Sequence, residues 1–403
     1  MTNWRNIKLD KIAEERRDNY QPNDDEEFPY IGLAHIEQDT LHLSGIGVSS
    51  DTKSTKRRFY IGDILFGSLR PYFRKVIFPD FEGVCSTDIT VLKAREDVDS
   101  LFLFYFISNQ DFIDYATNIS YGTKMPRAPW RILKESEWKI PQYQTQKKIG
   151  KLLSEFDKLI ENNTRHIQVL EEVAQLIYRE WFVHYRFPGH ENVRMVDTGT
   201  DFGEIPEGWE IRELSEFMDF VRGVEPGSKN YENEYIAGYI PFLRVGDLGK
   251  RSSDIYIKNA LAKGRVLNKN NIALTLDGTV GLVGIGLEGA YSSGIRKVII
   301  KPDSPLKRSY IYMELQSENI QGRIRTHARG TTILHASSAI GNFDFVLPDK
   351  KTLMRFDEII ELIIQQCLLL QAQADTLKDT RDLLLPILIS GEIDLADLDN
   401  EVD

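Results

Sequence analysis

The 403-residue sequence has few of the features that mark several classes of protein. It has only two cysteines, Cys85 and Cys367, in unrelated surroundings, so neither a disulfide framework nor a cysteine-based metal site is expected. Its longest apolar stretch, Leu101–Ile107, is much shorter than the roughly 18 residues that span a bilayer. The first residues show no signal-peptide pattern. We therefore expect a cytoplasmic protein with two inert thiols and no membrane partner.

Signatures of enzymes are equally scarce. The seven histidines never pair at metal-ligand spacing, and no phosphate-binding loop of the form G-x-x-x-x-G-K-S/T occurs. Gly284–Gly289 matches the dinucleotide pattern G-x-G-x-x-G, but a helix does not follow it, so we interpret it as a glycine-rich hairpin. Glu137–Lys139 has the E-x-K form of a nuclease without a nearby acidic partner. We predict that the chain is not an enzyme and binds no metal or cofactor itself.

The clearest internal pattern is the repeat of a whole domain. Trp209 follows Trp4 by 205 residues and Gly330 follows Gly122 by 208, so the matches keep their order and spacing. The period is too long for a solenoid, which indicates two copies of one domain. The matching pairs are Trp4–Leu9 with Trp209–Leu214, Pro29–Ala34 with Ile240–Gly246, Gly62–Phe66 with Asn271–Thr275, Gly122–Thr123 with Gly330–Thr331, and Ile140–Pro141 with Leu347–Pro348.

Each copy is followed by a long amphipathic pattern. Apolar residues recur three or four positions apart from Ile149 to Trp181, and again from Phe356 to Leu385. Patterns of this length are typical of coiled coils, and Asp349 is placed to cap the second helix. We predict two long helices that pack antiparallel through their apolar faces.

The copies themselves read as mixed domains. Short β-rich runs with glycine and proline turns fill 59–92 and 272–300, and Asp277–Gly278 is a turn signal in the second copy; helical patterns fill 101–119 and 310–327. The predicted class is α+β, with two similar mixed α/β domains separated by two long antiparallel helices. The predicted boundaries are a first domain at 1–141, a first long helix at 142–186, a polar linker at 187–207, a second domain at 208–348, a second long helix at 349–391 and an acidic tail at 392–403.

A duplicated domain on a rigid spacer suits a target with two similar parts, and double-stranded DNA with two half-sites is the obvious one. The net charge of −11 argues weakly against a chain that coats nucleic acid alone, but basic runs at Lys53–Arg58 and Arg323–Arg329 stand out from this acidic background. A solvated surface is the competing interpretation of each basic residue. The candidate DNA-binding residues are Lys53, Lys56, Arg57, Arg58, Arg70, Arg74, Thr123, Lys124, Arg127, Arg222, Ser228, Lys229, Lys250, Arg251, Arg325, Arg329, Thr331, Thr332 and His335.

The ends of the long helices carry more apolar side chains than a two-helix seam buries. Aromatic residues crowd into Tyr178–Phe187, and leucine and isoleucine into Leu383–Ile389. We predict a partner-binding surface there, with burial in a core as the competing interpretation. The candidate partner-binding residues are Tyr178, Trp181, Phe182, Tyr185, Leu385 and Ile387.

Taken together, the chain resembles the specificity subunit of a type I restriction-modification enzyme over its whole length. The resemblance rests on the two-copy plan and the Gly-Thr elements, together with Ile240–Leu248 and Gly62–Phe66. The helix opening Pro141–Ile160 and the helix close Leu384–Ile393 are its most specific parts. The second copy departs from the family's Gly-x-Thr-Pro-Ser element, because Gly223–Ser228 has Glu225 where threonine is usual.

This resemblance implies that each copy is a target recognition domain that reads one half of a split DNA sequence. The long helices would fix the spacer and dock two modification subunits, which would bind S-adenosylmethionine and methylate adenine. Restriction subunits that use ATP and Mg²⁺ would join the same assembly. Two alternatives remain open at this point: a helical scaffold without DNA contact, and a stand-alone nuclease, for which the sequence shows no clustered acidic ligands.

Overall fold

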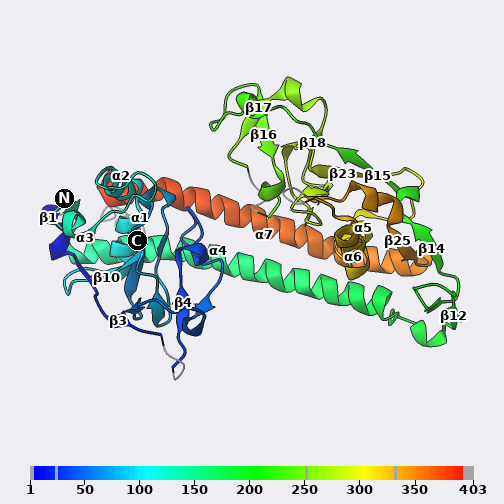
Figure 1. Ribbon diagram of the computed structural model, residues 1–403, viewed down its shortest axis with the longest axis horizontal. Helices are drawn as coiled ribbons and strands as arrows, with labels where there is room; N and C mark the ends of the chain where they lie inside the picture. The colour runs from blue at the N-terminus through cyan, green and yellow to red at the C-terminus, as the bar shows by residue number, and fades with distance from the viewer. Residues whose placement is uncertain (1–3, 23–25, 250–252, 331–333, 394–403) are drawn as a thin grey trace, which may run out of the picture. The chain divides into compact units, whose positions relative to one another are not determined.

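The computed structural model describes residues 4–22, 26–249, 253–330 and 334–393. The chain forms two compact units, unit 1 with Met1–Asn163 and Gln373–Asp403, and unit 2 with Thr164–Ala372. Both divisions fall inside long helices, so each unit contains one mixed domain and a segment of each helix (Figure 1). Within the described ranges no helix is both long enough and apolar enough to cross a membrane.

The domain of unit 1 contains two sheets, with strand orders β2-β10-β7-β8 and β3-β6-β9-β4-β5, and the separate pair β1-β11. The strands are β1 (Arg5–Lys8), β2 (Ala13–Glu15), β3 (Asn19–Tyr20), β4 (Pro29–Ile31), β5 (Gly47–Val48), β6 (Lys56–Phe59), β7 (Asp63–Gly67), β8 (Val76–Ile77), β9 (Gly83–Cys85), β10 (Ile89–Ala94) and β11 (Glu137–Ile140). The helices are α1 (Ser100–Ser108), α2 (Gln110–Asn118) and α3 (Trp130–Leu133).

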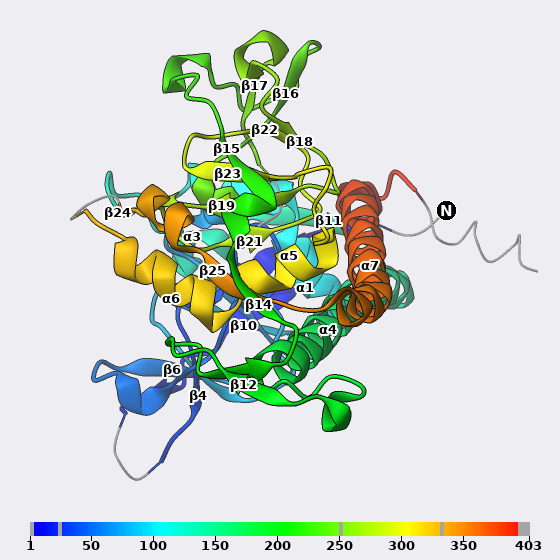
Figure 2. The same cartoon turned by 90° about the vertical axis from the view of Figure 1, so that its right-hand side faces the viewer.

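The domain of unit 2 has sheets of order β15-β23-β19-β21 and β17-β16-β22-β18, with the pairs β12-β13, β14-β25 and β20-β24. Its strands are β12 (Met195–Asp197), β13 (Glu204–Pro206), β14 (Glu210–Glu213), β15 (Met218–Arg222), β16 (Tyr239–Leu243), β17 (Tyr256–Lys258), β18 (Val266–Leu267), β19 (Ile272–Thr275), β20 (Asp277–Gly278), β21 (Val283–Gly284), β22 (Gly289–Tyr291), β23 (Ile295–Ile300), β24 (Leu334–His335) and β25 (Asp344–Leu347). The helices α5 (Arg308–Leu315) and α6 (Glu318–His327) follow β23, and α5 packs against β19 (Figure 2).

The predicted duplication is confirmed at the level of topology. The order β2-β10-β7-β8 in unit 1 matches β15-β23-β19-β21 in unit 2, and β6-β9-β4-β5 matches β18-β22-β16-β17. In each second sheet the corresponding pair, β4 with β9 and β16 with β22, is the parallel one. The unit 1 sheet has β3 as an additional edge strand. The two mixed domains are therefore copies of one α+β fold.

The predicted helices at 101–119 and 310–327 are each two helices. Asn109 adopts an extended conformation between α1 and α2, and its side chain accepts a hydrogen bond from the Gln110 amide. Ser317 does the same between α5 and α6, where it caps α6 through the Ile320 amide. A side chain that satisfies free amides at a helix start favours a break at that residue. Apolar periodicity alone did not reveal these breaks.

The long helices are α4 (Tyr143–Tyr178), which continues into a π-helical turn at Arg179–Val183, and α7 (Lys350–Ser390). Each helix has a series of buried residues spaced seven positions apart, which is the spacing of a coiled-coil seam. Within unit 2, Ile167 packs against Leu370 and Trp181 contacts Phe356, so the segments there run antiparallel, as predicted. The buried series are Gln146, Leu153, Ile160, Ile167, Ala174 and Trp181, and Leu353, Ile360, Cys367, Ala374, Arg381 and Leu388.

The start of α7 shows the predicted cap. The Asp349 carboxylate accepts hydrogen bonds from the amides of Lys351 (2.9 Å) and Thr352 (3.0 Å), and from the Trp209 indole (3.2 Å). Burial alone would raise the pKa of Asp349, but these hydrogen bonds and that of the Thr352 hydroxyl lower it below its ordinary value. The cap therefore favours the charged carboxylate at the helix N-terminus.

Two smaller interpretations are wrong. The stretch 187–207 is not a simple linker, because β12 and β13 pair there and Phe187 stacks on Trp209 in the unit 2 core (4.9 Å between ring centres). Gly284–Gly289 is not a hairpin, because β21 pairs with β19 whereas β22 pairs with β16 and β18. The segment thus connects two sheets, and the strand β22 stands where a dinucleotide site would need a helix.

Candidate nucleic-acid interface

The glycines of the two Gly-Thr elements, Gly122 and Gly330, lie in a loop that is present in both units. In unit 1, Tyr121 and Arg127 exchange backbone hydrogen bonds across the loop (3.1 and 3.3 Å), and in unit 2 Arg329 and His335 do the same (2.8 and 3.1 Å). Gly122 and Gly330 both have positive φ (106° and 132°), which glycine adopts without strain. The turn requires a glycine at this position in each copy, so its recurrence in the sequence reflects the same backbone geometry.

Each loop is attached to the end of an inner strand of the first sheet, β7 in unit 1 and β19 in unit 2. The Ala128 amide donates to the Ser68 carbonyl (2.9 Å) just after β7, and the Ala336 amide donates to the Leu276 carbonyl (2.7 Å) just after β19. The corresponding loops therefore lie at the same place in the two domains. We call them the reading loops, which are Tyr121–Arg127 in unit 1 and, in unit 2, the described residues Arg329, Gly330, Leu334 and His335.

In unit 1 the reading loop gathers several predicted DNA-binding residues. Thr123 and Lys124 are exposed, and Arg70 donates from Nη2 to the Lys124 carbonyl (3.1 Å). Arg127 donates from Nε and Nη2 to Asp88 Oδ1 (3.2 and 2.7 Å) and stays half-exposed. This side of unit 1 therefore carries three cations, of which only Arg127 is paired with a carboxylate among the described contacts.

In unit 2 the reading loop is joined to a polar network. His335 Nδ1 lies 2.7 Å from Asp277 Oδ1, and Arg296 donates from Nη2 to Asp277 Oδ2 (3.1 Å) and to the Ser337 hydroxyl (2.6 Å). Arg296 is buried, and burial lowers the pKa of its guanidinium while Asp277 opposes this effect. Asp277–Gly278, predicted as a turn, forms the short strand β20 that pairs with β24 at the base of the loop. The sequence did not single out Asp88 or Asp277 as partners of the loop; the recurring glycine was the signal that pointed to the region.

Other predicted residues extend this surface in unit 2. Arg222 is exposed and donates to the Ser293 carbonyl (3.3 Å), which also accepts a hydrogen bond from Arg296. The Ser293 hydroxyl donates to Glu225. Ser228 and Lys229 are exposed in the following segment, as is Arg329 on the loop itself. Arg325 is exposed but forms an ion pair with Glu318. Lys53 is an exposed residue of unit 1. DNA contact by each of these side chains stays a prediction.

Four basic residues predicted to bind DNA are engaged inside unit 1. Lys56 is buried and donates to the Ser54 carbonyl (2.6 Å), and burial lowers the pKa of its amine. Arg57 pairs with Glu15 (2.7 Å), and Arg58 lies over the rings of Tyr20 and Phe28. Alternation along β6 turns part of this basic run inward, which its charge alone did not reveal.

Arg74 is likewise turned away from the surface. Its Nε donates to the Ser108 carbonyl (2.7 Å) at the end of α1, and burial lowers the pKa of its guanidinium. We therefore remove Lys56 and Arg74 from the candidate interface, whereas DNA contact by the partly exposed Arg57 and Arg58 stays a prediction. Lys250, Arg251, Thr331 and Thr332, also predicted to bind DNA, lie outside the described residues.

The predicted partner-binding residues are mostly core residues, which corrects that prediction. Tyr178, Trp181 and Phe182 pack with Phe356 in the unit 2 core, and Leu385 is buried in the unit 1 core. Tyr185 and Ile387 are half-buried. The excess apolar surface at the helix ends is thus covered by the domain that each end supports. The exposed large apolar side chains of α4 and α7 are instead Tyr143, Leu159, Val169, Val173, Leu176, Met354, Ile359, Leu362, Leu369 and Leu383.

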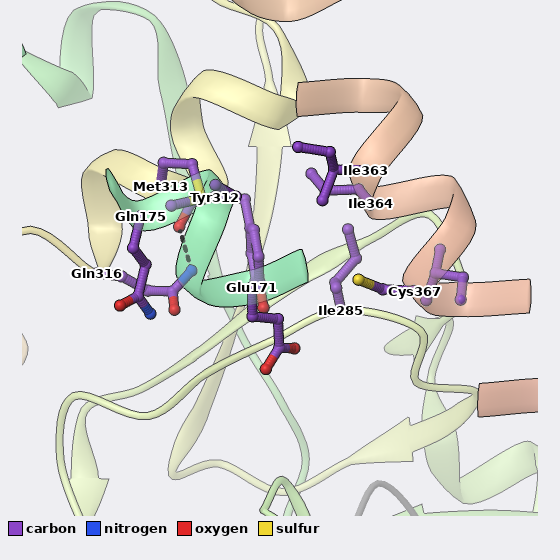
Figure 3. Close-up of a pocket in the computed structure, with 11 residues that line it drawn as sticks. Glu171, Gln175, Ile285, Tyr312, Met313, Gln316, Ile363, Ile364 and Cys367 are labelled. Atoms are coloured by element: carbon purple, nitrogen blue, oxygen red, sulfur yellow. Dashed lines mark hydrogen bonds between the residues drawn. The ribbon is translucent and has the colours of Figure 1, made fainter. Parts of the chain in front are cut away.

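The largely apolar cavity in unit 2 does not extend the interface. Its volume is about 30 Å³, room for one or two water molecules, and it lies between α4, α5 and α7. Figure 3 shows Ile285, Ile363 and Cys367 around it, together with the hydrogen bond from Gln316 Nε2 to the Tyr312 carbonyl (2.9 Å). Both cysteines are buried thiols, and burial raises the pKa of Cys85 to about 12. In the described part of the chain no cluster of His, Cys, Asp or Glu is arranged to hold a metal ion.

Comparison with known proteins agrees with the duplicated architecture. The chain matches the family described as type I restriction modification DNA specificity domain twice, over residues 1–172 and 206–367. It is 27% identical over 314 residues to the type I restriction enzyme MjaIX specificity subunit of Methanocaldococcus jannaschii, covering 75% of this chain and 71% of that protein. It is 22% identical over 466 residues to the HindI specificity subunit of Haemophilus influenzae, covering 98% and 100%.

A solved structure has the same fold. It is the crystal structure of the type I restriction-modification system S subunit from M. genitalium, with 15% identity, a TM-score of 0.58 and coverage of 96% of both chains. The topology, the two family matches and the relatives all follow the same two-copy plan. The chain belongs to the type I restriction-modification DNA specificity family.

Proposed function

We propose that this protein is the non-catalytic specificity subunit of a type I restriction-modification complex, and that each domain reads one half of a bipartite DNA target. The observation that carries this proposal is the reading loop, which occurs at the same place in both domains beside exposed cations. Arg and Lys side chains neutralise phosphates, and side chains on a firmly attached loop can read base edges. The net charge of −11 favours a role for partner subunits in holding the DNA.

The long helices supply the second part of the proposal. Val169, Val173 and Leu176 are three or four positions apart on α4, all about half-exposed, and Leu362 and Leu369 are seven apart on α7. Such stripes of exposed apolar side chains are typical of helix faces that bind another protein. We assign them to two modification subunits, which bind S-adenosylmethionine and methylate adenine. Restriction subunits that use ATP and Mg²⁺ complete this cytoplasmic assembly.

Sequence selection tests the function. The protein assembled with its modification subunits is incubated with a random DNA pool, and the retained fragments are sequenced. We expect a bipartite consensus with a fixed spacer, and binding that weakens steeply as salt rises. Retention of unrelated sequences, or a response flat in salt, would contradict the proposal. Loss of all DNA retention by a fully assembled complex would favour the scaffold alternative.

The helix faces have a separate test. Val173→Asp and Leu362→Asp are expected to prevent co-purification of the modification subunits without unfolding the chain, because both side chains are exposed. Asp379→Ala, at an exposed position of α7, is the matched control.

Inserting one helical turn into both long helices is expected to lengthen the spacer of the selected DNA. An unchanged spacer would contradict the role of the helices as a ruler.

A further inference from the structure

The same position of the reading loop carries an arginine in unit 1 and a histidine in unit 2. Arg127 and His335 each exchange backbone hydrogen bonds with the residue at the start of their loop. The next residues, Ala128 and Ala336, donate from their amides to carbonyls that directly follow β7 and β19. Both side chains are about half-exposed or more, and each is held by a carboxylate, Asp88 or Asp277. Two corresponding side chains in corresponding places therefore present different hydrogen-bonding groups to solvent.

Arg127 presents donors. Its Nε and Nη2 atoms both donate to Asp88, which fixes the plane of the guanidinium. Among the described contacts of Arg127 none involves Nη1, and the side chain is 48% exposed, so donors remain available to a ligand. A guanidinium has five N–H donors and no acceptor. It therefore complements a base edge with two acceptors, which in the major groove is the N7 and O6 edge of guanine.

In its neutral form His335 presents an acceptor. A carboxylate can only accept, so the short contact to Asp277 places a hydrogen on Nδ1 and, in that form, leaves Nε2 without one. The other oxygen of Asp277 is bonded to Arg296, which already supplies a positive charge beside that carboxylate. In a neutral imidazole with hydrogen on Nδ1, Nε2 accepts a hydrogen bond. It therefore complements an amino group of a base, which in the major groove is N6 of adenine or N4 of cytosine.

We propose that residues 127 and 335 are equivalent specificity-determining positions, with Arg127 selecting guanine in the first half-site and His335 selecting adenine or cytosine in the second. This inference rests on the proposed function. The cations beside each loop, Arg70 and Lys124 in unit 1 and Arg222 and Arg329 in unit 2, supply sequence-independent phosphate contacts that hold the loop against the DNA. The carboxylates keep both reading side chains in one orientation, which increases their discrimination.

Reciprocal substitution tests the proposal in the assembled complex. Arg127→His and His335→Arg are each used to select sequences from a random DNA pool, beside the unchanged protein. His335→Arg is expected to replace the preferred base at one position of the second half-site by guanine and to leave the first half-site unchanged. Arg127→His is expected to lower the preference for guanine at one position of the first half-site by roughly 10-fold to 100-fold. Arg127→Lys retains the charge but lacks the fork, and is expected to lose guanine preference while keeping the salt dependence of binding.

Arg212→His is the matched control, because Arg212 is also a partly exposed arginine paired with carboxylates, Glu216 and Glu210, on a strand outside the reading loop. Thermal melting of each variant shows that it is folded, and His335→Gln, which can also read adenine, provides a conservative second variant. If the unchanged protein selects no bipartite sequence, the proposed function itself fails. If it does, and the two reciprocal variants select the same bases as before or lose affinity for all sequences equally, this inference is overturned while the function stands.

Discussion

Replacing Arg381 with alanine is expected to destabilise unit 1 by about 3–5 kcal/mol, the usual loss when one partner of a buried ion pair is removed. The Arg381 side chain is fully buried on the seam of α7. It bonds to Asp157 of α4 and to Asp382 (2.9 Å), and the Tyr105 hydroxyl donates to Asp157. Without the guanidinium, the largely buried Asp157 carboxylate keeps a hydrogen bond from Tyr105 but loses its cation.

The domain repeat provides a matched double variant. Residues of α4 correspond to residues of α7 that are 207 positions later, as in Thr145 with Thr352, both of which are buried. By this relation, Ala174 of unit 2 corresponds to Arg381 of unit 1, and Ile364 of unit 2 corresponds to Asp157 of unit 1. The double variant Asp157→Ile with Arg381→Ala is therefore expected to recover part of the loss, since it removes both charges. A remaining cost of about 1–3 kcal/mol is expected, because the buried Tyr105 hydroxyl loses its acceptor and the pair in unit 2 borders a cavity of about 30 Å³.

Hydrogen exchange measured by mass spectrometry separates the two units, because amides of α1 report on unit 1 and those of α5 on unit 2. Urea unfolding gives the corresponding free energies as the product of midpoint and m-value, and Asp379→Ala is the control on the exposed side of α7. Faster exchange is expected in α1 for Arg381→Ala, with α5 unchanged. A loss below about 1 kcal/mol for the single variant, or a double variant no better than the single, would refute the reasoning.

Three further changes test other parts of the structure. Asp349→Ala is expected to cost about 1 kcal/mol by removing the α7 cap. Because the folded pKa of Asp349 is lowered, its contribution is present above the unfolded pKa and is lost as pH falls through the folded value, so urea midpoints of the variant should vary less with pH in acid. Glu314 behaves oppositely: burial raises its pKa beside Tyr178, so its contribution to stability is present below the unfolded pKa and is lost as pH rises through the folded pKa. The gain in the urea midpoint of unit 2 from Glu314→Gln should therefore grow as pH rises through that folded pKa. Gly223→Ala would place a Cβ atom 2.2 Å from the carbonyl oxygen of Tyr291 and should cost about 1–3 kcal/mol in thermal melts, whereas Gly246→Ala, with no atom within 4 Å, should change little.

The architecture could be predicted from the sequence because duplication made each weak signal appear twice. A short match such as Gly122–Thr123 means little alone, but its recurrence at Gly330–Thr331 marked the reading loop in both domains. The long helices were equally visible, since their apolar residues follow one periodicity over many turns. Periodicity does not show which domain covers the end of a helix. Tyr178 and Trp181 were therefore assigned to a partner surface, although the unit 2 core buries them.

The candidate interface was harder to predict because charge in a sequence does not show direction. Lys56 and Lys53 belong to one basic run, but only Lys53 faces solvent. The carboxylates that hold the reading side chains are also distant in sequence: Asp88 precedes Arg127 by 39 residues and Asp277 precedes His335 by 58. Neither distance corresponds to a local motif, so only the fold brings these partners together.

Arg381 shows how the repeat and the seam constrain each other. Arg381 belongs to the buried series of α7 that recurs every seven positions. The sequence did not reveal this, because a charged residue interrupts the apolar pattern of α7 between Leu377 and Leu384. A polar residue at a seam position lowers stability but restricts the partners with which a helix can pair. The corresponding residue on α4 is Ala174, which offers no cation to Asp157. The segment of α7 in unit 1 therefore fits Asp157 better than the corresponding segment of α4 would, and this difference favours pairing of the two unlike helices over pairing of two identical ones.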